Sequence, residues 1–430
     1  MSNSTFALVD CNNFFVSCLR LFRPDLEGKP VVALSSNDGC VVARSNEAKE
    51  LGIPMGAPAF KWRQFFKHHD VVQMSGNFEL YSDISRRIIS LLTSITPHVE
   101  VYSVDESFLD LSELLIGNHT LWGREIAKLT KQWIGVPVSV GIAPSKTLAK
   151  LATHQAKKNP ELQGVLDWIN LSTENQQKYL KQTLVSDVWG VGRQFAVRLR
   201  SAGINTAFDL STMRPAYAQK LLGIHGRQLV AELNGISCHP LQKLPKPAKT
   251  IAVTRTFGQD TNRFHVIESA LASFTTKASY RLRVNNQLTS EVGFFITTSR
   301  FKPGYISQTA KICLDQPTAD TGMLINAVIN SFKKYFNPKH NYHRAGVWLE
   351  NLSPSNNIQV NLLDQDGTVN QCKESQRMQA VDNINKRFGK NSVYYASELL
   401  NTSWQPKHSI DTPRYTTRWN ELPKLRSNKK

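Results

Sequence analysis

Residues 99–111, Val99-Glu100-Val101-Tyr102-Ser103-Val104-Asp105-Glu106-Ser107-Phe108-Leu109-Asp110-Leu111, contain two runs in which apolar and polar side chains alternate. Alternation with a period of two is typical of strands that bury one face, and the short segment between the runs predicts a β-hairpin. Asp105 and Glu106 lie at its turn. Adjacent carboxylates repel each other unless a cation lies between them, so this pair is a candidate Mg²⁺ site. The alternative is a solvated acidic turn, which is common in proteins.

A third carboxylate, far upstream, favours the metal site. Asp10 directly follows residues 6–9 (FALV), a short apolar run that predicts a buried strand. A carboxylate at the end of such a strand costs free energy unless it is hydrogen-bonded or binds a metal. If this strand and the hairpin lie in one sheet, the three carboxylates of Asp10, Asp105 and Glu106 converge. Three such groups are the ligand set for two Mg²⁺ ions about 3.5–4 Å apart in phosphoryl transfer.

Several separate stretches of the chain resemble the Y-family, translesion DNA polymerases. Within that family they are most similar to the UmuC type, the catalytic subunit of bacterial DNA polymerase V. The resemblance extends almost from end to end. Besides Asp10 and the turn at 103–107, the stretches that carry it are 22–26 (FRPDL), 28–32 (GKPVV), 37–44 (NDGCVVAR), 47–49 (EAK), 79–81 (ELY) and 413–418 (PRYTTR).

The resemblance implies an α+β, multidomain right-hand polymerase with a ferredoxin-like palm, small fingers, a helical thumb, an α/β little finger and an extended C-terminal tail. Strand and helix patterns that alternate around the hairpin agree with such a palm. The domains expected in chain order are the palm (1–22 and 75–170), the fingers (23–74), the thumb with a helix-hairpin-helix motif (171–236), a linker (237–249), the little finger (250–352) and the tail (353–430).

The resemblance also implies roles for the acidic residues. Asp10 and Asp105 would hold both Mg²⁺ ions, Glu106 would support the ion at the primer hydroxyl, and the backbone carbonyl of Cys11 would also ligate metal. The reaction would be template-directed nucleotidyl transfer, in which the primer 3′-OH attacks the α-phosphate of a dNTP and pyrophosphate leaves. Membership of the family further implies low fidelity, no proofreading and a role in damage-induced (SOS) mutagenesis.

Residues near the incoming nucleotide follow from the same resemblance. Phe15 occupies the steric-gate position, where a flat ring under the sugar would collide with a ribose 2′-OH. The neighbouring Phe14 is placed at the nucleotide too, although its spacing also suits a core aromatic on a helix. Lys49 lies where relatives often have an arginine at the triphosphate, Arg44 borders this region, and Lys150 matches a triphosphate-contacting lysine. A lysine neutralises phosphate but does not grip it bidentately. The alternative for these three cations is a solvated surface.

A glycine-containing hairpin at 188–193 (VWGVGR), with helical patterns on both sides, is typical of a helix-hairpin-helix motif. Gly190 and Gly192 would let the backbone approach a DNA phosphate beside Arg193, and amide N–H groups would bind the anion without reading sequence. A looser second copy lies at 223–227 (GIHGR).

Charge points to a polyanionic partner. The 430-residue chain has 52 Lys and Arg against 34 Asp and Glu, a net charge of +18. Residues 1–110 carry a net −3, so the excess lies in the remainder, and residues 245–355 alone carry +8. A near-neutral region for chemistry followed by a basic region fits a nucleic-acid enzyme. The alternative is a basic surface kept for solubility.

The location expected for the chain is the cytoplasm. The six cysteines are scattered without a Cys-x-x-Cys pair, which argues against a zinc site and suits a reducing compartment. The N-terminus has no signal-peptide pattern, and no apolar run approaches the ~18 residues that cross a bilayer, so no membrane partner is expected.

The tail after about residue 353 is expected to have little core-forming power. Within it, five residues resemble the short peptide by which polymerases dock on the sliding clamp, with a glutamine followed by spaced apolar anchors. These are Gln359, Val360, Asn361, Leu362 and Leu363. Relatives usually have Leu and an aromatic residue where Val360 and Leu363 stand, and the alternative is a chance apolar patch. Residues 407–430 carry seven Lys and Arg but two Asp and Glu, which suits DNA or an acidic partner.

The partners that the resemblance implies are primer-template DNA, dNTPs, a processed UmuD-type dimer, the RecA filament and the sliding clamp. Two other function classes stay open at this point. One is a catalytically silent, DNA-bound recruitment factor with the same fold, against which the intact carboxylate trio argues. The other is a two-metal nuclease that carries a helix-hairpin-helix module.

Overall fold

The computed structural model describes residues 4–242, 246–356, 367–389, 391–406, 410 and 412–423, with residues 367–372 described in their backbone alone. The chain divides into two compact units. The first contains Met1–Ser35, Gly39–Pro245 and Ile410–Lys430, and the second contains Ser36–Asp38 and Lys246–Ser409. None of the described residues forms a helix long and apolar enough to span a membrane.

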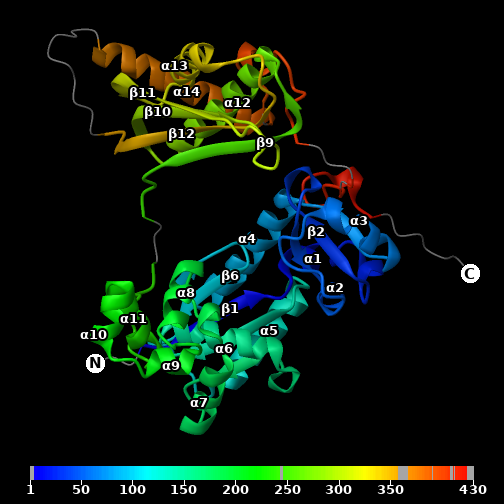
Figure 1. The fold of residues 1–430 in the computed structure, drawn as a ribbon, viewed down its shortest axis with the longest axis vertical. Coiled ribbons are helices and arrows are strands. Elements are labelled where there is room, and N and C mark those ends of the chain that lie inside the picture. Colours follow the sequence, from blue (N-terminus) through cyan, green and yellow to red (C-terminus); the bar gives the residue numbers. More distant parts are fainter. Residues whose placement is uncertain are drawn as a thin grey trace, which may run out of the picture. The chain divides into compact units, whose positions relative to one another are not determined.

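A five-stranded sheet in the order β5-β6-β1-β7-β8 forms the centre of the first unit (Figure 1). The middle strand β1 pairs antiparallel with both β6 and β7, while β5 and β6 form the predicted hairpin. The strand predicted at 6–9 is confirmed and continues through Asp10 to Cys11. The strand bounds are β1 (Phe6–Cys11), β5 (Val99–Val101), β6 (Glu106–Asp110), β7 (Val138–Ala143) and β8 (Val165–Asp167).

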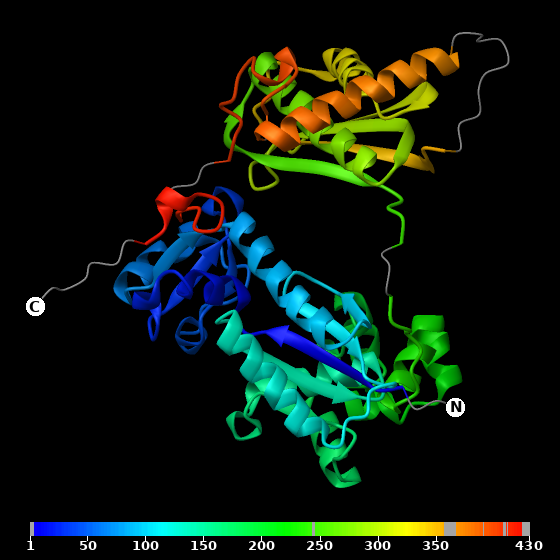
Figure 2. The same ribbon diagram turned by 180° about the vertical axis from the view of Figure 1, so that it is seen from behind.

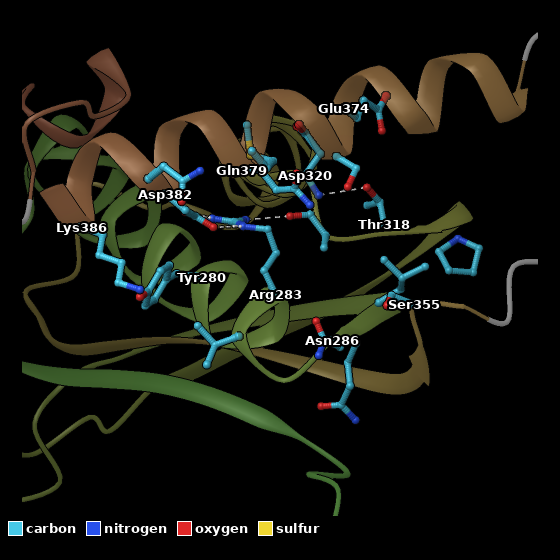
Figure 3. Close-up of a pocket in the computed structure, with 18 residues that line it drawn as sticks. Tyr280, Arg283, Asn286, Thr318, Asp320, Ser355, Glu374, Gln379, Asp382 and Lys386 are labelled. Carbon is cyan, nitrogen blue, oxygen red and sulfur yellow. Dashed lines mark hydrogen bonds and ion pairs between the residues drawn. The ribbon is translucent and has the colours of Figure 1, made fainter.

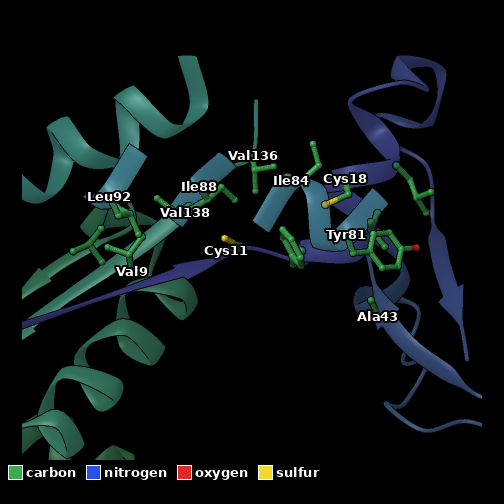
Figure 4. Packing of buried hydrophobic residues seen from close by; sticks show 14 of the residues in the cluster. Val9, Cys11, Cys18, Ala43, Tyr81, Ile84, Ile88, Leu92, Val136 and Val138 are labelled. Atoms are coloured by element: carbon green, nitrogen blue, oxygen red, sulfur yellow. The ribbon is translucent and has the colours of Figure 1, made fainter. Parts of the chain in front are cut away.

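Helices cover both faces of this sheet, and β1 shows which side chains each face receives. Ala7, Val9 and Cys11 belong to a core shared with α4 (Phe78–Ile95) and α5 (His119–Trp133), part of which is shown in Figure 4. Phe6 and Leu8 belong instead to a core shared with α6 (Lys146–Lys158). Because side chains alternate along a strand, Asp10 lies on the same face as Leu8, the face covered by α6.

A three-stranded sheet in the order β3-β2-β4 forms a second, smaller core in the first unit. The strands β2 and β3 pair antiparallel, whereas β4 is parallel to β2. The bounds are α1 (Phe14–Arg20), β2 (Val31–Leu34), β3 (Val41–Arg44), α2 (Asn46–Glu50), α3 (Ala59–His68) and β4 (Val72–Ser75).

The region after β8 is helical, as predicted. Its apolar residues, such as Leu180, Leu199 and Leu229, join the core that lies under α6, so these helices pack on the same side of the sheet as Asp10. The helices are α7 (Thr173–Gln182), α8 (Arg193–Ser201), α9 (Ala207–Ser211), α10 (Pro215–Leu222) and α11 (Ile224–Leu233).

The second unit is an antiparallel sheet in the order β11-β10-β12-β9 with helices over one of its faces (Figures 1 and 2). This unit has four strands and two helices over residues 251–354. They are β9 (Ile251–Thr261), α12 (Phe264–Val284), β10 (Gln287–Thr297), β11 (Ser307–Thr318), α13 (Thr321–Tyr335) and β12 (Tyr342–Pro354).

The prediction that the tail has little core-forming power was wrong. Helix α14 (Gly367–Phe388) extends over 22 residues and packs on the second unit beside a cavity of about 440 Å³ (Figure 3). Arg283 donates to both carboxylate oxygens of Asp382, at 2.7 and 2.8 Å, and Met378 is 2% exposed. Trp404, further along the tail, is 4% exposed against Phe274. Ion pairs and single large side chains attach this segment to the second unit. Its sequence therefore has no apolar periodicity from which the packing could be predicted.

The last described part of the tail packs on the first unit. The rings of Phe22 and Tyr415 stack at a centroid distance of 4.5 Å and an interplanar angle of 2°, and Tyr415 is 6% exposed. The Ser75 amide at the end of β4 donates to the Ile410 carbonyl at 3.0 Å, and Asn77 donates to the Pro413 carbonyl at 3.2 Å. The tail therefore contributes to the cores of both units.

Candidate active site

Asp10 and Glu106 meet at the ends of two paired strands. They are Cα partners in the antiparallel register of β1 and β6, and the Cys11 amide donates to the Asp105 carbonyl at 2.9 Å. Glu106 shares its face of the sheet with Phe108, which lies in the core under α6 together with Leu8. Both carboxylates therefore lie on the α6 side, where they line a cavity of about 260 Å³.

Helix α6 supplies one lysine to each of these acids. Lys157 Nζ lies 2.5 Å from Asp10 Oδ1, and Lys150 Nζ lies 2.9 Å from Glu106 Oε2. Residues seven apart lie on one face of a helix, two turns from each other, so the spacing of the lysines matches a pair of acids on adjacent strands. The Lys150 ammonium also lies 4.2 Å from the ring centroid of Tyr102.

Burial and neighbouring charges shift the pKa values of two residues in this cavity. Burial raises the pKa of Asp10 to about 7, the ion pair with Lys157 opposes that shift, and the neighbouring Glu106 adds to it. Burial also lowers the pKa of His154, which lines the same cavity, and the positive charges of Lys158 and Lys157 lower it further. The positive charges that pair with the two carboxylates are therefore those of Lys150 and Lys157.

Asp105 is placed differently from the other two acids. Its carboxylate accepts a hydrogen bond from Ser103 Oγ at 2.6 Å, and it is not among the residues that line the cavity. Over the described residues, no three His, Cys, Asp or Glu side chains come together as a group that could hold a metal ion. The structure therefore brings Asp10 and Glu106 together, and the convergence of all three acids stays a prediction. Carboxylate oxygens at adjacent strand ends are the donors that Mg²⁺ prefers, so the donor set fits that ion.

The predicted steric gate belongs to an aromatic cluster. Phe15 stacks on Tyr81 at 4.2 Å and an interplanar angle of 10°, and it meets the edge of Phe78 at 5.9 Å. It is half-buried, whereas Phe14 is 3% exposed and packs in the core of α1 and α4. The ring of Phe15 is thus held by its neighbours and keeps one accessible surface, while the Phe14 side chain has a core role.

Of the predicted phosphate ligands Arg44 in β3 and Lys49 in α2, Lys49 interacts electrostatically with Asp10. Arg44 donates to the Ile53 carbonyl, and Lys49 Nζ donates to Asn13 Oδ1 at 2.5 Å. Burial lowers the pKa of Lys49, the positive charges of Arg44 and Lys157 lower it further, and Asp10 opposes them. Charges from β3, α2 and α6 therefore act on one another around Asp10.

Lys157 is the functional candidate that the sequence did not single out. The resemblance placed Lys150 at the triphosphate, and the structure adds Lys157 directly on Asp10. The signal was available in the spacing of Lys150 and Lys157 on one helix face, but the choice of acid for each lysine depends on the tertiary packing of α6 on β1.

The predicted helix-hairpin-helix segment packs on the hairpin of β5 and β6 through Trp189. Its indole Nε1 donates to Tyr102 Oη at 2.9 Å. Gly190 has a φ of +90°, a conformation that favours glycine, and its carbonyl contacts His225 Nε2 at 3.0 Å. Gly192 precedes α8, which begins at Arg193. His225 belongs to the looser second copy, so the two hairpins contact each other. DNA binding by this segment stays a prediction, and the predicted clamp-binding residues 359–363 lie outside the described residues.

Three family models match the chain. The impB/mucB/samB family matches residues 9–154, and the C-terminal domain of that family matches residues 248–362. A domain of unknown function, DUF4113, matches residues 376–425. The last match covers most of α14, Trp404 and Tyr415, so its described residues lie in both units.

The chain is similar over at least 90% of its length to two named relatives. It is 37% identical to Protein UmuC of Salmonella typhimurium over 98% of this chain and 100% of that protein. It is 26% identical to DNA polymerase IV of Brucella melitensis over 90% of this chain and 84% of that protein. Among solved structures, a Y-family DNA polymerase chimera of Dbh and Dpo4 superposes with a TM-score of 0.64 at 22% identity, covering 83% of this chain and 100% of that one.

Proposed function

The chain belongs to the impB/mucB/samB family, to the UmuC type of Y-family DNA polymerases, and from this premise we propose how its own residues carry out the reaction. Its function is template-directed, low-fidelity translesion DNA synthesis, and the alternative of a silent recruitment factor is not favoured. The observation that carries the proposal is the register pair of Asp10 and Glu106, opposite two lysines of α6 and beside a cavity.

Asp10, Asp105, Glu106 and the Cys11 carbonyl would hold two Mg²⁺ ions, which when bound supply charge stabilisation at the transferring phosphoryl group. Asp105 accepts from Ser103 through Oδ1, so its Oδ2 would be the oxygen that takes part. Once Asp10 and Glu106 bind the ions, Lys157 and Lys150 would no longer pair with these carboxylates. Both lysines would then face the triphosphate. In the absence of nucleotide they are counter-charges that keep the buried acids from repelling each other.

Nucleotide selection rests on the aromatic cluster around Phe15. Because Tyr81 and Phe78 fix its ring, the gate cannot swing away from the sugar without losing two aromatic contacts. Arg44 and Lys49 neutralise the triphosphate from the other side. The resulting site accepts a deoxyribose and rejects a 2′-OH by steric conflict.

DNA and partner contacts are assigned to the remaining, more basic parts of the chain. Gly190, Gly192 and Arg193 bind a backbone phosphate, and the second unit binds the duplex through its positive charge. Residues 359–363 dock on the sliding clamp, and a processed UmuD-type dimer and RecA regulate the enzyme in the bacterial cytoplasm.

A primer-extension assay with the full-length chain, Mg²⁺ and the four dNTPs tests the proposal. The template carries one abasic site, and a matched template without damage serves as control. We expect extension on both templates, with products that pass the abasic site. Degradation of the primer would indicate a nuclease, and an unchanged primer on both templates would indicate a protein without polymerase chemistry.

A further inference from the structure

Asn13 has a backbone conformation that few side chains tolerate. Its φ of 49° and ψ of 43° are left-handed, and it precedes α1 without capping that helix through its side chain. Asparagine is one of the few residues that adopt this conformation at modest cost. The side chain is therefore available for contacts with another element.

That side chain binds two residues of α2. Asn13 Nδ2 donates to Asn46 Oδ1 at 2.9 Å, and Asn13 Oδ1 accepts from Lys49 Nζ at 2.5 Å. Lys49 Nζ also lies 3.4 Å from Asn46 Oδ1. Asn46 and Lys49 are three residues apart, so they share one face of α2. The side-chain amides of Asn13 and Asn46 thus bind each other and together hold the ammonium of Lys49.

Helix α2 itself is held firmly. Ser45 is fully buried and its hydroxyl accepts from the Ala48 amide, which caps the helix. On another side of the helix, Arg20 of α1 pairs with Glu47 at 3.0 Å. With α2 fixed, the remaining freedom of Lys49 is that of its four-carbon side chain, and the contact with Asn13 restricts it.

We propose that Asn13 is a positioning residue, which holds the Lys49 ammonium where it meets the triphosphate of the incoming nucleotide; this rests on the function proposed above. An ammonium has three N–H donors, of which Asn13 takes one and Asn46 a weaker second, so a third is left for a phosphate oxygen. A free lysine loses side-chain entropy when it binds phosphate, and a lysine that is already held loses less. Asn13 also lies between Asp10 and Phe15, so one turn positions the acid, the gate and the cation.

The competing explanation is that asparagine stands here for its backbone alone. Glycine and alanine at this position separate the two explanations. Asn13→Gly keeps the left-handed conformation accessible and removes the side chain, whereas Asn13→Ala removes the side chain and strains the backbone. A backbone role predicts that the glycine variant resembles the wild type. A positioning role predicts that it loses nucleotide affinity.

A double-mutant cycle with Lys49→Met in the full-length chain tests the coupling, read from steady-state insertion of one dNTP with Mg²⁺. We expect Asn13→Gly to raise the KM for dNTP about tenfold with kcat within about twofold, as for loss of a hydrogen bond to a charged group. In the Lys49→Met background Asn13→Gly should have no further effect. Additive effects in the cycle, or a wild-type KM for Asn13→Gly, would overturn the proposal.

Acetylation of Lys49, followed by mass spectrometry, gives a readout that does not depend on catalysis. Asn13→Gly should raise the acetylation rate of Lys49 in the free protein, and dCTP with Mg²⁺ should protect Lys49 in the wild type more than in the variant. If the wild type extends no primer, the proposed function fails, but the acetylation of Lys49 still shows whether Asn13 holds that side chain. Equal acetylation and equal protection in the two proteins would contradict the role of Asn13.

Discussion

Asp10 and Glu106 face each other in register across the antiparallel strands β1 and β6, and each is paired with its own lysine from α6. The first acid comes from the N-terminal strand and the second from the hairpin. Two like charges this close are tolerated because the lysines lie within 3 Å of them. In the proposed function, this arrangement would let one cavity take up cations and a triphosphate, with each lysine passing from a carboxylate to a phosphate.

Lys157→Met should lower kcat/KM for dNTP insertion about 100-fold, the scale on which one well-placed electrostatic group acts. Lys157 is the counter-charge of Asp10 and faces the triphosphate once that carboxylate has another cation. The matched control is Lys158→Met, because Lys158 neighbours it on the helix without an ion pair to the two acids. Single-nucleotide insertion kinetics check this, and equal activity of the two variants would contradict it.

Phe15→Ala should raise the insertion of ribonucleotides relative to deoxyribonucleotides. The change removes the ring that Tyr81 holds in place, so a 2′-OH meets no obstacle. Phe14→Ala is the control, because the buried Phe14 side chain should cost about 3–5 kcal/mol of stability without changing sugar selection. Insertion assays with dNTP and NTP measure the ratio of ribonucleotide to deoxyribonucleotide insertion. Unchanged NTP insertion by Phe15→Ala would show that Phe15 is not the steric gate.

Stability without divalent cations should depend on pH through Asp10. Burial raises the pKa of Asp10 from its ordinary 3.8 to about 7, so between these values the folded state binds more protons than the unfolded state. The free energy of unfolding therefore falls as pH rises from about 4 to about 7. Asp10→Asn lacks this titration, so its stability relative to the wild type should rise over that range. Urea unfolding in EDTA at pH 5 and pH 7 measures the difference, and a constant difference would show that the Asp10 pKa is not raised.

Tyr415→Ala should destabilise the first unit by about 3 kcal/mol, because the ring stacks on Phe22 and is buried. Trp419→Ala is the matched control in the same segment, since Trp419 is 89% exposed and its loss should be nearly neutral. Thermal unfolding of the full-length chain measures both. If both variants unfold like the wild type, the packing of residues 412–423 on the first unit adds no stability.

Local periodicity explains why much of the fold was predictable. The hairpin 99–110 follows from alternation, and α4 follows from apolar residues at helical spacing with Asn77 as its N-cap. The four-residue strand β4 has too little pattern to be found, and its partner β2 is distant in sequence. Helix α14 was missed because its attachment depends on the pairing of Asp382 with Arg283 and on isolated buried side chains.

The site was predictable in its residue types and less so in its geometry. Asp10 and Glu106 were identified from a strand end and a turn, and the register of β1 and β6 brings them together. The ion pair of Lys157 with Asp10 depends on how α6 packs on the sheet, and the hydrogen bond of Lys49 to Asn13 depends on how α2 packs. Local sequence patterns do not predict such packing. Asp105 shows the converse, since its carboxylate bonds Ser103 instead of joining the other two.

Single-turnover insertion of one dNTP in Mg²⁺, comparing the wild type with Asp105→Ala, tests the central claim most directly. The claim is that Asp10, Asp105 and Glu106 act together on cations beside the nucleotide. We expect rapid insertion by the wild type and a loss of at least about 1,000-fold in Asp105→Ala, at the upper end of what one charge-stabilising group supplies. Insertion by Asp105→Ala at close to the wild-type rate would contradict the account, because Asp105 would then have no part in the chemistry.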